Sequence, residues 1–129
     1  MPKNKSKGSK AERELLKMFL DENFRAVRVA GSGVMEKADC DLLVGKIGKK
    51  YAIEVKSSSS SLKYISKIQI ENFLIFSEIF DLTPVIAIRF NREGWFFLSP
   101  NELKIAGKNF VIGLEELKKN GKRFSQFFN

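Results

Sequence analysis

The sequence predicts an α/β domain with a central mixed five-stranded sheet flanked by two long helices. An amphipathic stretch lies near the N-terminus, five short apolar runs follow it, and a longer helical stretch separates the third run from the fourth. This order of helices and strands favours one sheet with helices packed against it. The 129 residues are enough for a single domain spanning 1–129 with a substantial core, and the 43% hydrophobic content excludes a disordered chain.

The first helix is expected to begin at Ser9. Ser9 and Glu12 fit a capping box, in which the serine caps the helix and the acid stands at its third residue. An apolar stripe at helical spacing then continues to about Glu22. Residues 1–8 are polar and carry lysines without acids, so we expect them to form a flexible basic arm ahead of the helix.

Five strands are expected where short apolar runs lie between turn residues. They are Phe24–Ala30, Asp39–Gly45, Lys50–Lys56, Thr83–Phe90 and Trp95–Leu98. A loop at 46–49 would pair Gly45 with Lys50 in a hairpin, and continuing that register sets Asp41 opposite Glu54 and Asp39 opposite Lys56. Because side chains alternate between the two faces of a strand, Cys40 then joins an apolar face, while the acids and Lys56 share the other.

The second long helix is expected from about Tyr64 to Phe80. Its apolar residues surround most of its circumference, and a helix of that kind must be covered on more than one side. One side can pack on the sheet and the other needs a partner, which favours a homodimer. Residues 100–129 form a C-terminal extension with a short helix near Leu114, and the three phenylalanines that follow are expected to cap the core rather than extend the dimer or bind a partner.

The charge distribution points to a polyanionic partner. The chain carries 23 Lys and Arg against 15 Asp and Glu, a net charge of +8, and the excess lies in its first 30 and last 26 residues. Basic ends around a neutral middle suit a protein that binds nucleic acid. No apolar run is long enough to span a bilayer, so we expect no membrane association, and the single cysteine favours a cytoplasmic location.

The absence of histidine limits the chemistry that the chain can perform. It excludes nucleophilic triads that use histidine and metal sites with imidazole ligands. Carboxylates, lysines, hydroxyl groups and a hard metal ion are left as the catalytic groups.

The predicted hairpin brings such groups together. Two carboxylates opposite each other on paired strands repel, and a cation between them removes the repulsion, so Asp41 and Glu54 suit Mg²⁺ or Mn²⁺. Lys56 follows on the same face, where it would hold the attacking water or stabilise charge on a phosphate. These groups fit metal-assisted phosphodiester hydrolysis. A surface ladder of salt bridges, pairing Asp39 with Lys56 and Glu54 with Lys50, is the alternative.

Glu12 has two compatible roles. The capping box explains its position without any catalysis, yet it also stands at the head of the apolar stripe that faces the sheet. There it would complete a metal site formed by Asp41 and Glu54, with Arg13 beside it to contact a phosphate. The N-terminal lysines would follow the phosphates of a nucleic acid backbone; they are Lys3, Lys5, Lys7 and Lys10.

The motifs occur in an order that resembles a known family. They are Lys7–Leu15, Val27–Gly33, Asp41, Glu54–Ser57, Tyr64–Ile65 and Gln69. Together they resemble the archaeal Holliday-junction resolvases, which are homodimeric, magnesium-dependent members of the PD-(D/E)xK nuclease superfamily with a restriction-endonuclease-like fold. The resemblance covers Lys7 to about Leu98. One departure is Cys40, which stands where the family usually has a proline before its metal-binding aspartate, and Asp39 adds a second candidate acid.

The resemblance implies roles for several of the motif residues. Glu12, Asp41 and Glu54 would be the catalytic and metal-binding acids, Lys56 the catalytic lysine and Ser32 a catalytic-loop residue near the scissile strand, with Arg13 and Arg28 on backbone phosphates. Mg²⁺ would be the cofactor, with Mn²⁺ able to replace it. The dimer would form through the helix at Tyr64–Phe80.

The expected function is therefore a structure-selective, metal-dependent DNA endonuclease. It would resolve four-way junctions by paired nicks in homologous recombination and repair. One alternative is a nuclease of the same superfamily that cuts flaps, single strands or duplex DNA. Another is a basic DNA-binding module without catalysis.

Overall fold

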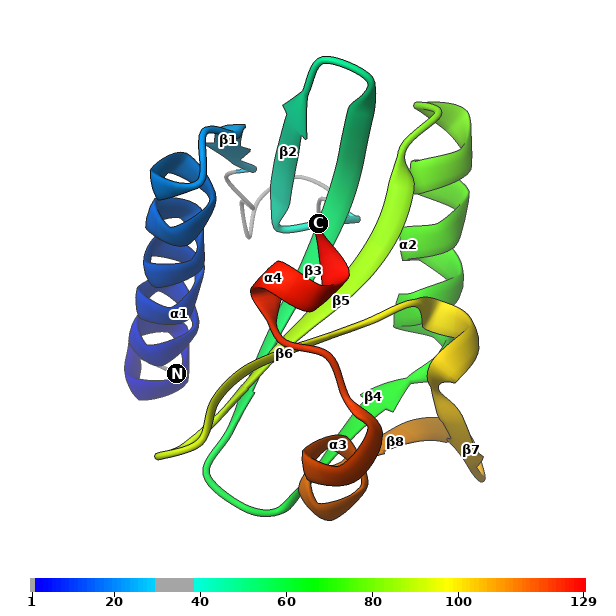
Figure 1. Cartoon of the computed structure of the whole chain (residues 1–129). Coiled ribbons are helices and arrows are strands. Elements are labelled where there is room, and N and C mark those ends of the chain that lie inside the picture. Colours follow the sequence, from blue (N-terminus) through cyan, green and yellow to red (C-terminus); the bar gives the residue numbers. More distant parts are fainter. Residues whose placement is uncertain (1, 30–38) are drawn as a thin grey trace.

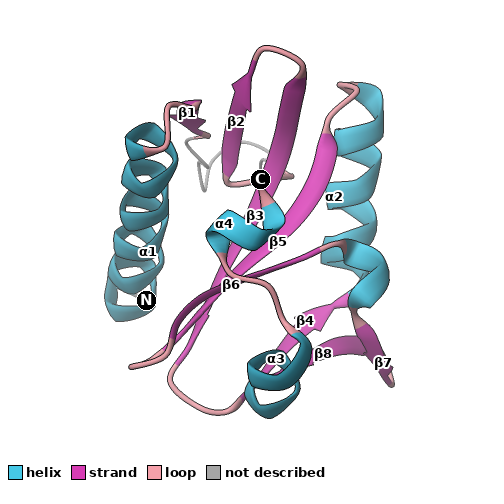
Figure 2. Ribbon diagram, viewed as in Figure 1, coloured by secondary structure: helices cyan, strands magenta, loops and turns pink. Residues whose placement is uncertain are grey.

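A mixed five-stranded sheet lies between two long helices in the computed structural model, which describes residues 2–29 and 39–129 (Figures 1 and 2). The predicted fold class is thereby confirmed. The strands, in sheet order, are β1 (Arg25–Arg28), β2 (Leu42–Lys46), β3 (Lys49–Ser58), β5 (Thr83–Phe90) and β6 (Gly94–Leu98). Strands β3 and β5 pair in parallel and the other neighbours pair antiparallel. The parallel pair requires a long crossover, which contains helix α2 (Lys67–Ile79).

Helix α1 spans Pro2–Asp21, so it begins seven residues before the expected start at Ser9. The prediction of a separate arm at residues 1–8 is therefore corrected for residues 2–8, whose backbone is helical. Proline is favoured in the first turn of a helix, and once the apolar stripe is docked each further helical residue adds a hydrogen bond without a new nucleation step. Ser9 lies inside the helix and its hydroxyl accepts a hydrogen bond from Arg28.

A second, smaller sheet was not predicted. It contains β4 (Leu62–Ser66), β8 (Asn109–Gly113) and β7 (Lys104–Ala106), in that order. The expected helix at Tyr64–Phe80 therefore starts too early, because Tyr64 pairs with Val111 in this sheet. The helix begins after Ser66, whose hydroxyl oxygen accepts a hydrogen bond from the backbone N–H of Gln69 at 3.1 Å. The rest of the C-terminal extension forms the 3₁₀ turn η1 (Pro100–Glu102), α3 (Leu114–Asn120) and α4 (Phe124–Phe127).

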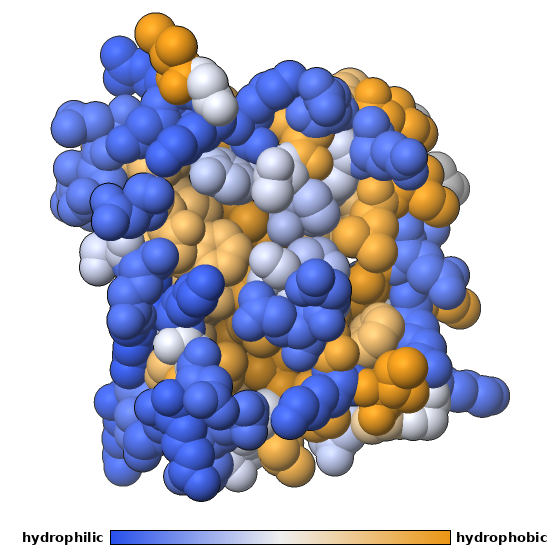
Figure 3. Space-filling model, turned by 45° about the vertical axis from the view of Figure 1, so that its right-hand side comes forward, coloured by the Kyte–Doolittle hydropathy of each residue, from blue (hydrophilic) through white to orange (hydrophobic). Residues whose placement is uncertain are grey.

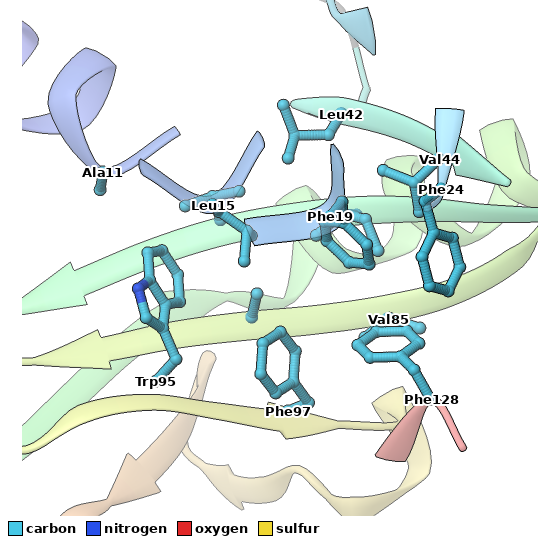
Figure 4. Packing of buried hydrophobic residues seen from close by; sticks show 13 residues of the cluster. Ala11, Leu15, Phe19, Phe24, Leu42, Val44, Val85, Trp95, Phe97 and Phe128 are labelled. Carbon is cyan, nitrogen blue, oxygen red and sulfur yellow. The ribbon is translucent and has the colours of Figure 1, made fainter. Parts of the chain in front are cut away.

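One hydrophobic cluster fills the space between the sheet, α1 and the C-terminus (Figure 4). Phe128 is 6% exposed, and its ring centroid lies 5.1 Å from those of both Phe19 and Phe97. Phe124 and Phe127 pack against the same cluster. The expectation that the C-terminal phenylalanines cap the core is confirmed.

A second cluster fills the opposite face of the sheet, under α2. Phe73 of α2 packs there with Ile86 and Ile88 of β5. Cys40 is buried in this cluster rather than beside Leu42, which corrects its predicted face. Strand β2 begins only at Leu42, so the alternation of side chains does not extend back to Cys40.

The outer side of α2 keeps large apolar side chains at the surface (Figure 3). Ile68, Ile75 and Ile79 are 70%, 55% and 72% exposed, and Phe80, next after the helix, is 60% exposed. Among the described residues, none of the helices has the length and apolar character needed to cross a membrane.

Candidate active site

The β2–β3 hairpin has the predicted register, with Gly45 opposite Lys50 and Val44 opposite Tyr51. The pairing of β2 with β3 ends at Leu42 and Ile53, so the ladder does not extend to Asp39 and Lys56 as expected. Asp41 lies just beyond β2, where its backbone N–H donates to the carbonyl oxygen of Ile53 at 2.9 Å. Its carboxylate oxygen Oδ2 accepts a hydrogen bond from the backbone N–H of Val55 at 2.8 Å. This bond holds the Asp41 carboxylate against β3.

Glu54 is a charged residue in the interior of the protein, where its exposure is only 4%. It stands in the middle of β3, which has strands on both sides. Its oxygen Oε2 accepts a hydrogen bond from Nε2 of Gln69 at 3.0 Å and lies 3.3 Å from Nζ of Lys56. Lys56 therefore pairs with Glu54, in place of the predicted pairing with Asp39.

Glu12 lies on α1, which packs on the face of the sheet opposite α2. Its oxygen Oε1 accepts a 2.7 Å hydrogen bond from Nε of Arg28, which also donates through Nη2 to the Ser9 hydroxyl at 2.8 Å. In each of the three acids, these hydrogen bonds thus hold a single carboxylate oxygen: Oε1 of Glu12, Oδ2 of Asp41 and Oε2 of Glu54. The other oxygen of each acid is free of those donors.

Burial and mutual repulsion disfavour charge on the two hairpin acids. Loss of hydration, with the negative charge of Asp41, raises the pKa of Glu54 from 4.5 to about 8 even though Lys56 opposes the shift. Loss of hydration, with the charge of Glu12, also raises the pKa of Asp41 from 3.8 to about 6, against the hydrogen bond from Val55. A cation between these carboxylates would remove both penalties.

The donor set fits a hard divalent ion, because all the candidate ligand atoms are carboxylate oxygens. Within residues 2–29 and 39–129, no group of three acidic or cysteine side chains is close enough to hold an ion in this conformation. Glu12 is held by Arg28 instead. Asp39, the alternative acid, is half-buried, and its side chain forms neither a hydrogen bond nor an ion pair with another described residue.

Three of the predicted DNA-binding residues have side chains that the structure describes. Arg13 and Lys10 are exposed on α1, whereas Arg28 contacts Glu12 and Ser9. Ser32 and the side chains of the remaining lysines, Lys3, Lys5 and Lys7, lie outside the described residues.

A cavity of about 560 Å³ opens beside Lys56. Gly8 of α1, the serine-rich segment 57–60 and Tyr64 line it together with that lysine. A smaller cavity of about 230 Å³ shares Ser57 and is lined by Lys10 and Arg89. The serine segment and Arg89 had no role in the sequence-based prediction, because neither forms a motif and only the fold brings them next to α1.

Gln69 is a second residue that the sequence reasoning left without a role. The helix was expected to start at Tyr64. With that start, Ser66 would lie inside the helix, and its capping of the Gln69 backbone N–H would not be expected. A start at Ser66 sets Gln69 at the third helical residue, on the turn nearest Glu54.

Comparisons with known proteins agree with the fold. The family model described as "Archaeal holliday junction resolvase (hjc)" matches residues 3–128. A crossover junction endodeoxyribonuclease Hjc of Methanocaldococcus jannaschii is 44% identical over 107 residues, covering 82% of this chain and 75% of the relative. The Hjc of Archaeoglobus fulgidus is 36% identical over 132 residues, covering 96% of each. A solved structure of A. fulgidus Hjc, a Holliday junction resolvase, superposes with a TM-score of 0.82 at 30% identity over 94% of both chains. With a matching model over nearly its whole length and relatives at this identity, the chain belongs to the archaeal Holliday junction resolvase family.

Proposed function

We propose that this chain is a metal-dependent DNA endonuclease that resolves four-way junctions by paired nicks. The observation that carries the proposal is the pairing of a buried Glu54 with Asp41 and Lys56 on one hairpin of the sheet. Burial and mutual repulsion make the charged forms of these two acids costly for the stability of the fold. Acids in such surroundings are typical of functional sites. The family relationship favours this function over cleavage of flaps or plain duplex and over DNA binding without catalysis.

The three acids would hold the cofactor, Mg²⁺ with Mn²⁺ as a substitute. A divalent ion bound by Asp41, Glu54 and Glu12 supplies an activated water and neutralises charge that develops on the phosphate. Lys56, 17% exposed at its side chain and directed at Glu54, would hold the water or stabilise the phosphate oxygens. Arg28, which now contacts Glu12, would release that acid when it turns to a DNA phosphate.

The remaining DNA contacts would follow the basic residues near this site. Arg13 and Lys10 are exposed on α1 and are assigned to backbone phosphates, as are Lys3, Lys5 and Lys7. Such contacts position the DNA without reading its sequence, so selectivity would rest on the shape of the junction. Ser32 keeps its predicted role near the scissile strand. A DNA substrate also agrees with the expected cytoplasmic location.

A homodimer would supply the second nick. The apolar residues on the outer side of α2, with Ile75 among them, form a surface that a second copy would cover. Each protomer would then cut one of two symmetrically placed strands.

Competition between DNA forms tests the proposal. A labelled four-way junction is incubated with the protein and Mg²⁺, in the presence of excess unlabelled linear duplex or unlabelled junction. Paired nicks that only the junction competitor suppresses are expected. Equal suppression by the linear duplex would contradict junction selectivity, and an absence of nicking with either Mg²⁺ or Mn²⁺ would contradict the assignment as a nuclease.

A further inference from the structure

Gln69 is the one side chain of α2 with a hydrogen bond to a proposed metal ligand among the described residues. Its Nε2 donates to Oε2 of Glu54 at 3.0 Å, across the boundary between α2 and the sheet. Gln69 is half-buried and Glu54 is almost fully buried, so water competes little for this bond.

The local sequence would ordinarily give this glutamine another partner. Ser66-x-x-Gln69 is a capping-box pattern, in which the side chain at the third helical residue returns to the backbone N–H of the cap. The serine half of the box is formed, since the Ser66 hydroxyl accepts from the Gln69 backbone at 3.1 Å. The glutamine side chain donates to Glu54 instead.

The geometry at Glu54 shows what this contact achieves. Gln69 and Lys56 both approach Oε2, which leaves Oε1 free of these two donors. Asp41 is held in a similar way, through Oδ2 and the Val55 N–H. When a hydrogen bond fixes one oxygen of a metal-binding carboxylate, the other oxygen is held in one orientation. Less conformational freedom is then lost when the ion binds.

We propose that Gln69 is a positioning residue of the metal site, which orients Glu54 so that Oε1 faces the ion. This inference rests on the proposed function, because it takes Glu54 to be a metal ligand. Gln69 itself touches neither the ion nor the DNA. Its position in the first turn of α2 places the amide within hydrogen-bond reach of Glu54.

Metal binding without DNA is the direct test, since it does not depend on cleavage. Mn²⁺ is titrated into the full chain and the electron paramagnetic resonance signal of the free ion gives the dissociation constant. Gln69→Met keeps the length of the side chain and removes the donor, and we expect it to weaken Mn²⁺ binding roughly 10- to 100-fold. Gln69→Asn keeps the amide but shortens its reach, and we expect the same loss, which provides a second variant if the first does not fold.

Ser66→Ala is the matched control, because it removes the cap of α2 and leaves the Gln69 amide in place. If Gln69 only stabilised the helix, Ser66→Ala would weaken Mn²⁺ binding as much as the Gln69 variants do, and that result would overturn the inference. We expect Ser66→Ala to lower the melting temperature while its Mn²⁺ affinity stays near the wild-type value. In junction cleavage, the Gln69 variants should need more Mg²⁺ to reach half of the maximal rate, with unchanged junction affinity in EDTA.

Glu54→Gln distinguishes a wrong role for Gln69 from a wrong metal site. If it weakens Mn²⁺ binding and the Gln69 variants do not, the role of Gln69 is wrong and the proposed site stands. If Glu54→Gln leaves Mn²⁺ binding unchanged, Glu54 is not a ligand, and the metal site and the role of Gln69 are both overturned.

Discussion

Raising the pH in the absence of metal should destabilise this protein, because Glu54 holds a proton in the folded state that it loses in the unfolded chain. Burial and the charge of Asp41 raise the pKa of Glu54 from 4.5 to about 8. Between these two values the folded protein binds more protons than the unfolded one, so the free energy of unfolding falls as the pH rises. One pKa unit corresponds to about 1.4 kcal/mol, which sets a ceiling of about 5 kcal/mol on the loss. Relaxation of the structure and entry of water reduce this loss. We therefore expect the free energy of unfolding to fall by about 2–3 kcal/mol, which lowers Tm by on the order of 10 °C.

Thermal melts in EDTA at pH 5, 6, 7 and 8 measure this loss. Wild-type Tm should fall across the series. Glu54→Gln should flatten the curve above about pH 6. In this variant Asp41 still destabilises the protein as the pH rises, but its pKa is about 6, so most of its effect on Tm is reached by that pH. Glu71→Gln, an exposed acid on α2, is the control and should keep the wild-type slope. Mg²⁺ should restore Tm at pH 8 in the wild type and much less in Glu54→Gln. A wild-type Tm that stays constant from pH 5 to pH 8 in EDTA would contradict a raised pKa of Glu54 in the folded protein.

Three further predictions concern the core, the thiol and the dimer. Phe128→Ala should cost about 3–4 kcal/mol in urea unfolding, because the ring is buried among other aromatic rings, and a cost below about 1 kcal/mol would show that the C-terminus does not cap the core. Cys40 should resist a maleimide at pH 8 until the protein unfolds, since burial and nearby acids raise the pKa of its thiol to about 12; rapid labelling of the folded protein would contradict that burial. Ile75→Glu, at an exposed position of α2, should convert the proposed dimer to a monomer in light scattering with little change in Tm. An unchanged mass would exclude this side of α2 as the interface.

The hairpin illustrates which parts of the structure local patterns can predict. Its register follows from a short loop and from period-two alternation, and both the pairing of Gly45 with Lys50 and the central sheet were predicted correctly. The small sheet was missed, because Tyr64 and Ile65 precede a helical stretch without a break in apolar character and their strand partners lie more than forty residues later. A non-local pairing of this kind leaves no periodic signal in the sequence.

In the site too, local patterns predicted some features, and others depend on tertiary contacts. Asp41, Glu54 and Lys56 were brought together by strand alternation, which is local. The face of Cys40 was predicted wrongly because the strand ends at Leu42, and a strand end depends on tertiary contacts such as the bond from Val55 to Asp41. Gln69 had no assigned role, because its contact with Glu54 depends on how α2 packs on the sheet.

Single-turnover cleavage of a four-way junction is the most direct test of the proposal that Asp41 and Glu54 form a metal-dependent catalytic site. Rates are measured with saturating protein and Mg²⁺ for the wild type, Asp41→Asn, Glu54→Gln and Asp39→Asn, with junction binding in EDTA measured in parallel. We expect Asp41→Asn and Glu54→Gln to lower the rate by at least about 100-fold while junction binding persists, and Asp39→Asn to cleave at nearly the wild-type rate. A wild-type rate in either Asp41→Asn or Glu54→Gln would contradict the proposed site.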